Sequence, residues 1–328
     1  VLIYLVVVAG SFVRITGSGM GCPDWPKCFG QWVPPSSADE LPADYKETYS
    51  EGREKKVEKF SKFLNSLGMS ETAEKLQNDP NVLKEEDFNP RKTWTEYVNR
   101  LFGFLAGDAM LIAFFWLLLI PKGTGSKKRK LLLLAGFNLV LMAIQAWFGS
   151  IVVATNLVPW TITVHMLLAL VIIGLQLYLI RSVSPAMKGH LKLPKWTLYL
   201  LWVCFAITIY QMFLGTQVRE SIDELTKMGY GRDDWTEQLG MPFYIHRSFS
   251  WLVLILLTAI AWMNERGEKL VMIRALYVVL ALELVSGVLL AYANMPGLVQ
   301  TAHLIFATIL FGILTMGVIR AKTSPQIS

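Results

Sequence analysis

Three histidines lie inside long apolar segments of this 328-residue chain, where an imidazole is costly to place. His165, His246 and His303 each stand about five to seven residues from one end of their segment, roughly 8 to 10 Å deep at the rise of an α-helix. Because an ionisable side chain among apolar residues loses its hydration, it marks a candidate functional site. The fourth histidine, His190, lies in a basic connection, and we expect it at the surface.

Two of these histidines form a matched pair. His246 and His303 occupy equal depths in their segments, which suits two imidazoles that bind one haem iron from opposite sides. His165 lacks such a partner, because the position equivalent to His246 is Asn99, and a neutral amide is a poor ligand for haem iron. An iron held by His165 alone, or with water or Asn99 as a weak sixth ligand, keeps one face open to oxygen. We therefore expect a reactive first site and a second site that relays electrons.

Charged residues lie at the same depth. Glu96 precedes Asn99 by three residues, on a neighbouring face of one helix. Its carboxylate could transfer protons during oxidation of a bound substrate, or it could be a helix N-terminal acid that the macrodipole favours. Four arginines recur in pairs at this boundary, where they either bind haem propionates or extend to lipid headgroups. They are Arg14, Arg100, Arg219 and Arg247.

A glycine-rich loop, RITGSGMGCPDWPKCFGQW at 14–32, follows the first apolar segment. In an oxidising compartment its Cys22 and Cys28 could form a disulfide that fixes the loop, and two free structural thiols are the alternative. Zinc is disfavoured, because no nearby histidine or further cysteine completes a set of four ligands. Cys204 stands alone within an apolar segment, and we interpret it as an inert core thiol.

The elements that must position these residues are apolar helices. The chain is 53% hydrophobic and 17% charged, with a mean hydropathy of +0.43, which is typical of a membrane protein. Segments of about 20 apolar residues cross a bilayer as helices. The sequence predicts an all-α membrane protein with eight transmembrane helices, at about 1–13, 97–120, 131–153, 160–180, 196–214, 243–263, 270–291 and 298–319.

Lysine and arginine are concentrated in alternate connections, at 121–130, 181–195 and 264–274, and in the C-terminal tail. By the positive-inside rule these segments are cytoplasmic. We therefore expect a bacterial inner (cytoplasmic) membrane protein with both termini in the cytoplasm and the long loop 15–93 on the outer side. The same rule accounts for the net charge of +6, so we expect no nucleic-acid partner.

An internal repeat relates the two halves of the chain. GSFVR at 10–14 matches GTQVR at 215–219, YVNRLF matches YIHRSF, GSIVVATN matches GVLLAYAN, and HMLLA matches HLIFA, with identical spacings between the last two motifs. The repeat predicts two pseudo-symmetric tandem four-helix bundles, at 1–182 and 183–328. Gln145 and Glu283 are equivalent polar positions, which we expect to hydrogen-bond neighbouring helices.

The first copy carries a charged insertion at 36–92. Its apolar residues recur at helical spacing, as Phe60, Phe63, Leu64 and Leu67. We expect one or two amphipathic helices over the outer ends of the bundle, and a solvated spacer is the alternative.

The motifs RITGSGMGCPDWPKCFGQWVP, TEYVNR, TVHMLLA, YIHRSFS and TAHLIFA together resemble the haem A synthase family, over essentially the whole chain. The resemblance implies that His246 and His303 are axial ligands of haem b, and that His165 binds the substrate, haem O, in the N-terminal bundle. It also implies that Glu96 is an essential glutamate and that Cys22 and Cys28 form a disulfide near the substrate site.

The reaction implied by this resemblance is the stepwise oxidation of a porphyrin methyl group to a formyl group by a haem-dependent oxidoreductase. The resemblance implies that a haem O synthase supplies the substrate and that the product goes to cytochrome oxidase assembly. It also implies an unidentified electron donor, and a homo-oligomer is compatible with it. Asn99 departs from the family pattern, which has a histidine there in many members. The alternative is a dihaem b-type electron-transfer cytochrome without oxygenase activity, which explains the histidines but leaves Glu96 and the glycine-rich loop without a role.

Overall fold

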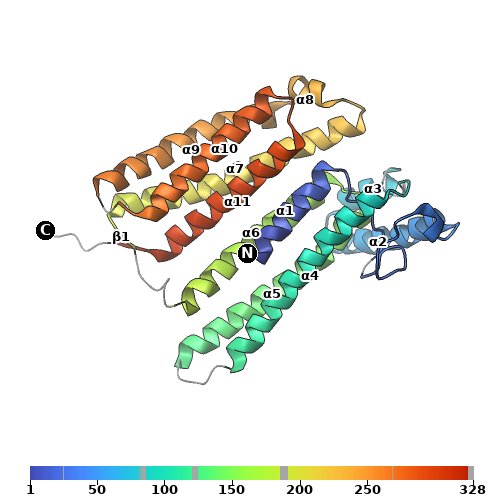
Figure 1. The fold of residues 1–328 in the computed structure, drawn as a ribbon, viewed down its shortest axis with the longest axis horizontal. Coiled ribbons are helices and arrows are strands. Elements are labelled where there is room, and N and C mark those ends of the chain that lie inside the picture. Colours follow the sequence, from blue (N-terminus) through green and yellow to red (C-terminus); the bar gives the residue numbers. More distant parts are fainter. Residues whose placement is uncertain are drawn as a thin grey trace. The chain divides into compact units, whose positions relative to one another are not determined.

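The computed structural model is almost entirely helical (Figure 1). It describes residues 1–24, 26–80, 82, 86–119, 125–184, 191–267 and 269–323, and His190 lies outside these ranges. Within them are eleven α-helices, one 3-10 helix and two short strands. Their bounds are α1 Leu2–Ile15, η1 Ala38–Glu40, α2 Tyr45–Ser66, α3 Ser70–Asn78, α4 Pro90–Leu119, α5 Gly125–Ala154, α6 Pro159–Val183, β1 Leu191–Leu193, α7 Lys195–Lys227, α8 Arg232–Gln238, α9 Met241–Arg266, α10 Val271–Tyr292, α11 Gly297–Arg320 and β2 Ala321–Thr323.

Seven of the described helices are long and apolar enough to cross a membrane, namely α4, α5, α6, α7, α9, α10 and α11. This confirms the predicted all-α, multi-pass membrane protein. The remaining predicted segment, 1–13, forms α1. Its 14 residues span only about 21 Å, so membrane crossing by this segment stays a prediction. Helix α7 departs most from its predicted bounds, because it continues from 214 to Lys227, where Arg219 and Asp223 pair one turn apart at 2.8 Å.

The chain packs as two compact units. The first comprises Val1–Trp116 and Leu139–Leu168, and the second comprises Leu117–Asn138 and Ala169–Ser328. The predicted division after residue 182 stays a prediction.

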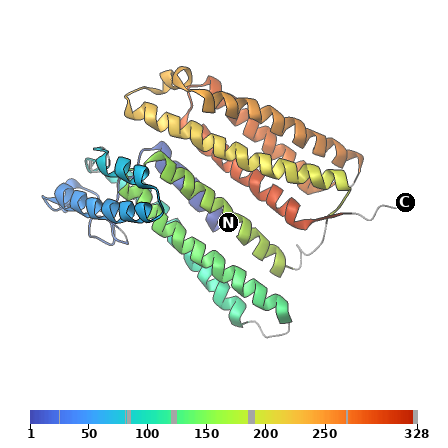
Figure 2. The same ribbon diagram turned by 180° about the vertical axis from the view of Figure 1, so that it is seen from behind.

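In the second unit, α7, α9, α10 and α11 form a four-helix bundle (Figures 1 and 2). Helix α7 packs against α9 and α11, and α10 packs against the same two helices. Residues from all four helices fill its core, among them Leu201, Leu257, Leu276 and Leu314, which are almost fully buried. At one end β1 pairs in parallel with β2, which ties the start of α7 to the end of α11.

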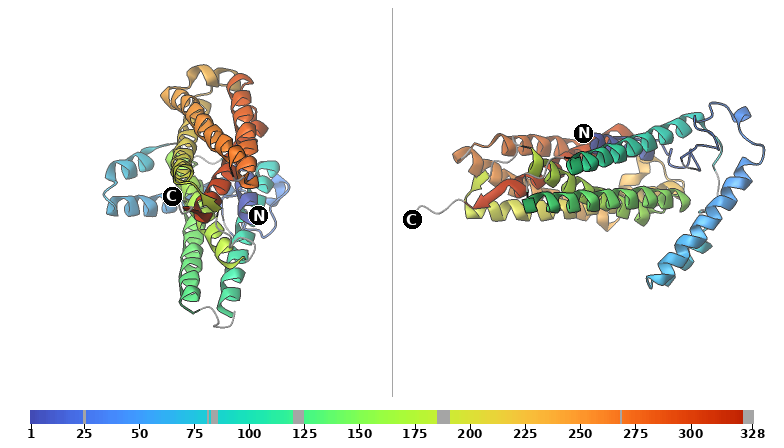
Figure 3. Two further views of the ribbon diagram at one scale, coloured as in Figure 1. Left: turned by 90° about the vertical axis from the view of Figure 1, so that its left-hand side faces the viewer. Right: turned by 90° about the horizontal axis from the view of Figure 1, so that it is seen from below.

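In the first unit, α2 and α3 pack on each other and run obliquely to α4 (Figure 3). An apolar cluster joins them to α5, with Phe60 and Leu64 of α2 buried beside Phe148. The prediction of amphipathic helices in the insertion is therefore confirmed, and their position over the outer ends of the bundle stays a prediction. Only part of the predicted apolar stripe is buried, since Phe63 is 44% exposed and Leu67 is 59% exposed.

Two equivalent turns explain the equal spacings in the repeat. Asn156 follows α5 and Asn294 follows α10, and both have left-handed backbones with φ of 49° and 55°. Asparagine adopts this conformation more readily than most residues do. Each turn leads into the next helix, so His165 of α6 and His303 of α11 lie six residues after their helices begin.

Candidate functional site

The rings of His246 and His303 lie side by side in the second unit. Their centroids are 6.3 Å apart and their planes cross at 83°. Two imidazole nitrogens that each bind one iron at about 2 Å place their ring centres about 6 Å apart. The predicted pair is therefore brought together at the spacing that an iron between the rings requires.

A glycine of a neighbouring helix faces each of these rings. A Cβ atom added to Gly215 of α7 would lie 3.3 Å from Cε1 of His246. A Cβ atom on Gly287 of α10 would lie 3.3 Å from Cε1 of His303. Both contacts are tighter than ordinary packing, so the glycines make room for the rings.

In the first unit a glycine also faces the His165 ring, and another glycine lies at ordinary contact distance from Asn99. A Cβ atom on Gly149 of α5 would lie 3.2 Å from Cε1 of His165, and one on Gly10 of α1 would lie 3.6 Å from Oδ1 of Asn99. Asn99 Oδ1 and His165 Nδ1 are buried, and neither has a hydrogen-bond partner within the described residues. Buried polar atoms ordinarily have partners. The orphaned amide oxygen of Asn99 fits a polar or metal-bearing group such as a haem, and Gly149 makes room for the His165 ring.

Hydrogen bonds fix the orientation of the His303 ring. Its Nδ1 lies 2.9 Å from the Ser286 hydroxyl and 3.2 Å from the carbonyl oxygen of Glu283. The Ser286 hydroxyl donates its own proton to that carbonyl at 2.8 Å. It must therefore accept a proton from Nδ1, which leaves Nε2 as the nitrogen with a lone pair for iron. Nε2 lies 3.3 Å from Oε1 of Glu283.

Glutamine side chains bind the backbone carbonyl oxygens of the other two histidines. Gln145 donates to the carbonyl oxygen of His165 at 3.0 Å, and Gln211 donates to that of His246 at 2.8 Å. The predicted helix-to-helix role of Gln145 is thus confirmed. Sequence reasoning missed Gln211 and the ring-contacting glycines. A shared spacing could have revealed them, since a Gln or Glu stands four residues, about one helical turn, before each glycine, at 145/149, 211/215 and 283/287.

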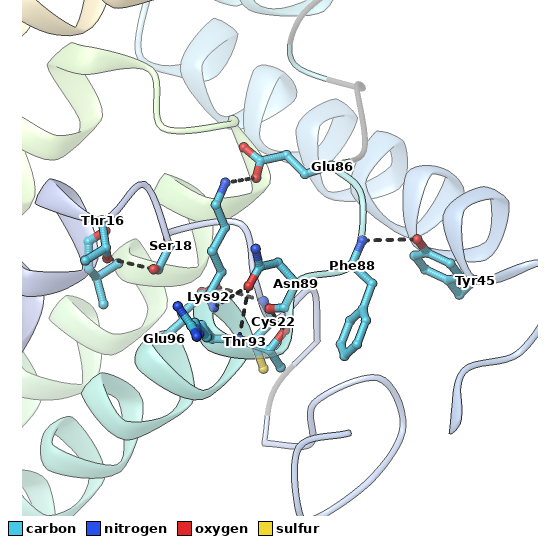
Figure 4. A network of polar contacts seen from close by, with 12 residues as sticks. Thr16, Ser18, Cys22, Tyr45, Glu86, Phe88, Asn89, Lys92, Thr93 and Glu96 are labelled. Atoms are coloured by element: carbon cyan, nitrogen blue, oxygen red, sulfur yellow. Dashed lines mark hydrogen bonds and ion pairs between the residues drawn. The ribbon is translucent and has the colours of Figure 1, made fainter. Parts of the chain in front are cut away.

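Glu96 lies on α4 beside the polar residues drawn in Figure 4. It is buried, with 2% of its surface exposed. Its carboxylate accepts the backbone N–H of Cys22 at 2.8 Å and forms an ion pair with Arg100. Arg100 also donates to the carbonyl oxygens of Cys22 and Asp24. Glu96 and Arg100 therefore hold the loop that the Cys22–Cys28 disulfide closes. A role for Glu96 in proton transfer stays a prediction.

Gly21 explains how this loop reaches Glu96. A Cβ atom at Gly21 would lie 2.6 Å from the carbonyl carbon of Lys92 and 2.7 Å from the nitrogen of Thr93. No side chain fits there, so the loop backbone lies directly on α4. The next residue, Cys22, thereby presents its N–H to the carboxylate of Glu96.

The three other boundary arginines also contact protein groups, and their predicted role in binding propionates stays a prediction. Arg14 contacts Met166 Sδ at 3.9 Å, Arg219 pairs with Asp223 at 2.8 Å, and Arg247 donates to Tyr292 OH at 2.6 Å.

The profile of the COX15-CtaA family, described as cytochrome oxidase assembly protein, matches residues 1–315. The chain belongs to this family. Three relatives are called haem A synthase. That of Wolbachia sp. subsp. Brugia malayi is 24% identical, with 95% of this chain and 91% of the relative covered. Those of Shewanella oneidensis and Bradyrhizobium sp. ORS 278 are 24% and 26% identical over 55% and 66% of this chain.

The chain spans 42% of the length of the Shewanella protein and 53% of the Bradyrhizobium protein. The resemblance predicted from the motifs is confirmed at the level of the family.

Proposed function

We propose that this chain oxidises the methyl group of haem O to the formyl group of haem A. Family membership and the relatives' name support the reaction class. The observation that carries the proposal is the spacing of 6.3 Å between the His246 and His303 rings, because it suits a resident haem held from both faces.

In this proposal each histidine has its own task. His246 and His303 hold haem b, and His165 holds the haem O substrate beside Asn99. Bound haem supplies one-electron and oxygen chemistry. The chain's own residues orient the two groups, since Gln145 and Gln211 fix the backbones that carry His165 and His246.

Glu96 and Arg100 keep the disulfide loop closed on the first turns of α4. A buried carboxylate three residues before Asn99 is well placed to accept or return a proton during oxidation of a substrate in that unit. Arg100 pairs with Glu96 and also binds the loop, so the loop and the proposed proton acceptor are held together.

We also propose the predicted arrangement in the membrane. The chain crosses a bacterial inner membrane eight times as two pseudo-symmetric bundles, with both termini cytoplasmic and the insertion outside. Supporting this are the glycines that face the rings of His165, His246 and His303, and the equivalent turns at Asn156 and Asn294. Haem O synthase, an oxidase assembly factor, an electron donor and a possible second copy of the chain are the proposed partners.

The test supplies haem O to membranes that contain the wild-type chain, His165→Ala or the control His190→Ala, and then extracts the pigments. Wild type and His190→Ala should yield a formyl-bearing haem, whereas His165→Ala should yield none and keep its haem b spectrum. Normal haem A production by His165→Ala would contradict the assignment of His165. A wild-type chain that holds haem but never makes haem A would support the electron-transfer cytochrome instead.

A further inference from the structure

We propose that the residue before the ring-contacting glycine sets how firmly His303 and His165 hold their iron. That residue is Ser286 next to His303 and Phe148 next to His165. In this proposal Ser286 makes His303 a strong, permanent ligand, while Phe148 leaves His165 a weaker ligand from which a haem can depart. The inference rests on the proposed function, which places haem at both histidines.

Ser286 and Phe148 occupy the same position relative to their histidines. Each directly precedes the glycine whose Cβ position faces the ring, Gly287 in one case and Gly149 in the other. The hydroxyl of Ser286 is a hydrogen-bond acceptor for Nδ1 of His303 at 2.9 Å. This contact places a polar group directly behind the ring.

Phe148 offers His165 an aromatic face instead. The two rings are nearly parallel, at 16°, with centroids 6.5 Å apart. Phe148 cannot accept a hydrogen bond in the plane of the imidazole, and Nδ1 of His165 is buried without a partner in the part of the chain that the structure describes. Phe60 of α2 packs edge-on against Phe148 at 6.4 Å, so the insertion holds this aromatic ring in place.

The chemical consequence follows from ligand basicity. When Nδ1–H donates to an oxygen, electron density shifts toward Nε2, which then binds a metal more strongly. Losing such a partner typically costs about 10- to 100-fold in metal affinity. The expected strength of His246 as a ligand is intermediate. Its Nδ1 makes no hydrogen bond within 3.5 Å, but the Gln211 backbone interacts with its ring.

This difference suits the two proposed occupants. Haem b is a resident cofactor that must stay through many turnovers. Haem O must enter and haem A must leave, so a ligand without a supporting hydrogen bond favours release. Ser286 and Phe148 are therefore positioning residues, since they act through the histidines.

The test measures haem loss to excess apomyoglobin and the midpoint potential of haem b in the purified full chain. Ser286→Ala should lose haem b about 10- to 100-fold faster and raise its potential, because a less basic imidazole stabilises ferric iron less. Ser286→Thr, which keeps the hydroxyl, should restore both values. Ser182→Ala is the control, because the Ser182 hydroxyl donates only to the backbone of its own helix.

The reciprocal variant is Phe148→Ser, loaded with haem O. It should release haem O more slowly than the wild type does, because a hydroxyl then faces Nδ1 of His165. Unchanged haem b retention and potential in Ser286→Ala would overturn the proposal. If Ser286→Ala does not fold, an unchanged release rate in Phe148→Ser would overturn it. A wild-type chain without haem would refute the proposed function instead.

Discussion

Replacing Glu96 by glutamine tests how the disulfide loop is held. The substitution keeps the size of the side chain and one acceptor for the N–H of Cys22, but it removes the charge that Arg100 pairs with. Both side chains of this pair are largely buried, with 3% of Glu96 and 16% of Arg100 exposed. Water therefore cannot replace the lost carboxylate as it would at the surface.

The magnitude follows from the contacts. A hydrogen bond to a charged group contributes about 1.5–3 kcal/mol net, and the neutral amide weakens two such bonds, from Cys22 and from Arg100. We expect the loop to open more easily by about 1.5–3 kcal/mol, which corresponds to a roughly 10- to 150-fold larger open population. The disulfide can be attacked only when the loop opens, since both cysteines are completely buried.

The assay follows the rate at which dithiothreitol reduces the Cys22–Cys28 disulfide, with the new thiols trapped by a mass-tagged maleimide. Glu96→Gln should be reduced roughly 10- to 150-fold faster than wild type. The matched control is Glu58→Gln, which breaks an i,i+4 pair with Lys62 that is largely exposed, and it should behave as wild type. Equal reduction rates for wild type and Glu96→Gln would refute the reasoning.

Three further predictions concern the first unit. Phe60→Ala should destabilise the packing of α2 on α5 by about 3–5 kcal/mol, measured as faster proteolysis of the insertion, whereas Leu67→Ala should have little effect because Leu67 is 59% exposed. Gly149→Val should displace the His165 ring, which a Cβ atom would meet at 3.2 Å, and lower haem O binding in a spectral titration. Burial raises the pKa of Tyr49 from 10.0 to about 12, so the folded state keeps a proton that the unfolded chain releases. Stability should therefore fall between pH 10 and pH 12 in thermal melts, and Tyr49→Phe should reduce that fall.

The sequence was sufficient to predict which segments form long apolar helices, because each is a continuous hydrophobic run. The pairing of His246 and His303 was also predictable, because the two histidines stand at equal depth in their apolar segments. These inferences depend on local patterns and on comparison of the chain with itself.

Contacts between distant segments could not be predicted in the same way. Glu96 is 74 residues from Cys22, and nothing in the local pattern indicates that its carboxylate accepts that N–H. Phe148 reads as one more apolar residue of a membrane helix until the structure places it beside His165 and Phe60. Such roles depend on which helix faces lie together, and periodicity leaves that open.

The proposed function requires that His246 and His303 hold one haem between them. Its most direct test is the absorption spectrum of the purified chain, oxidised and reduced, compared with His246→Ala and His303→Ala. The account predicts a low-spin b-type spectrum in the wild type that either substitution converts to high spin or abolishes. A wild-type chain free of porphyrin, or variants with the unchanged low-spin spectrum, would contradict it.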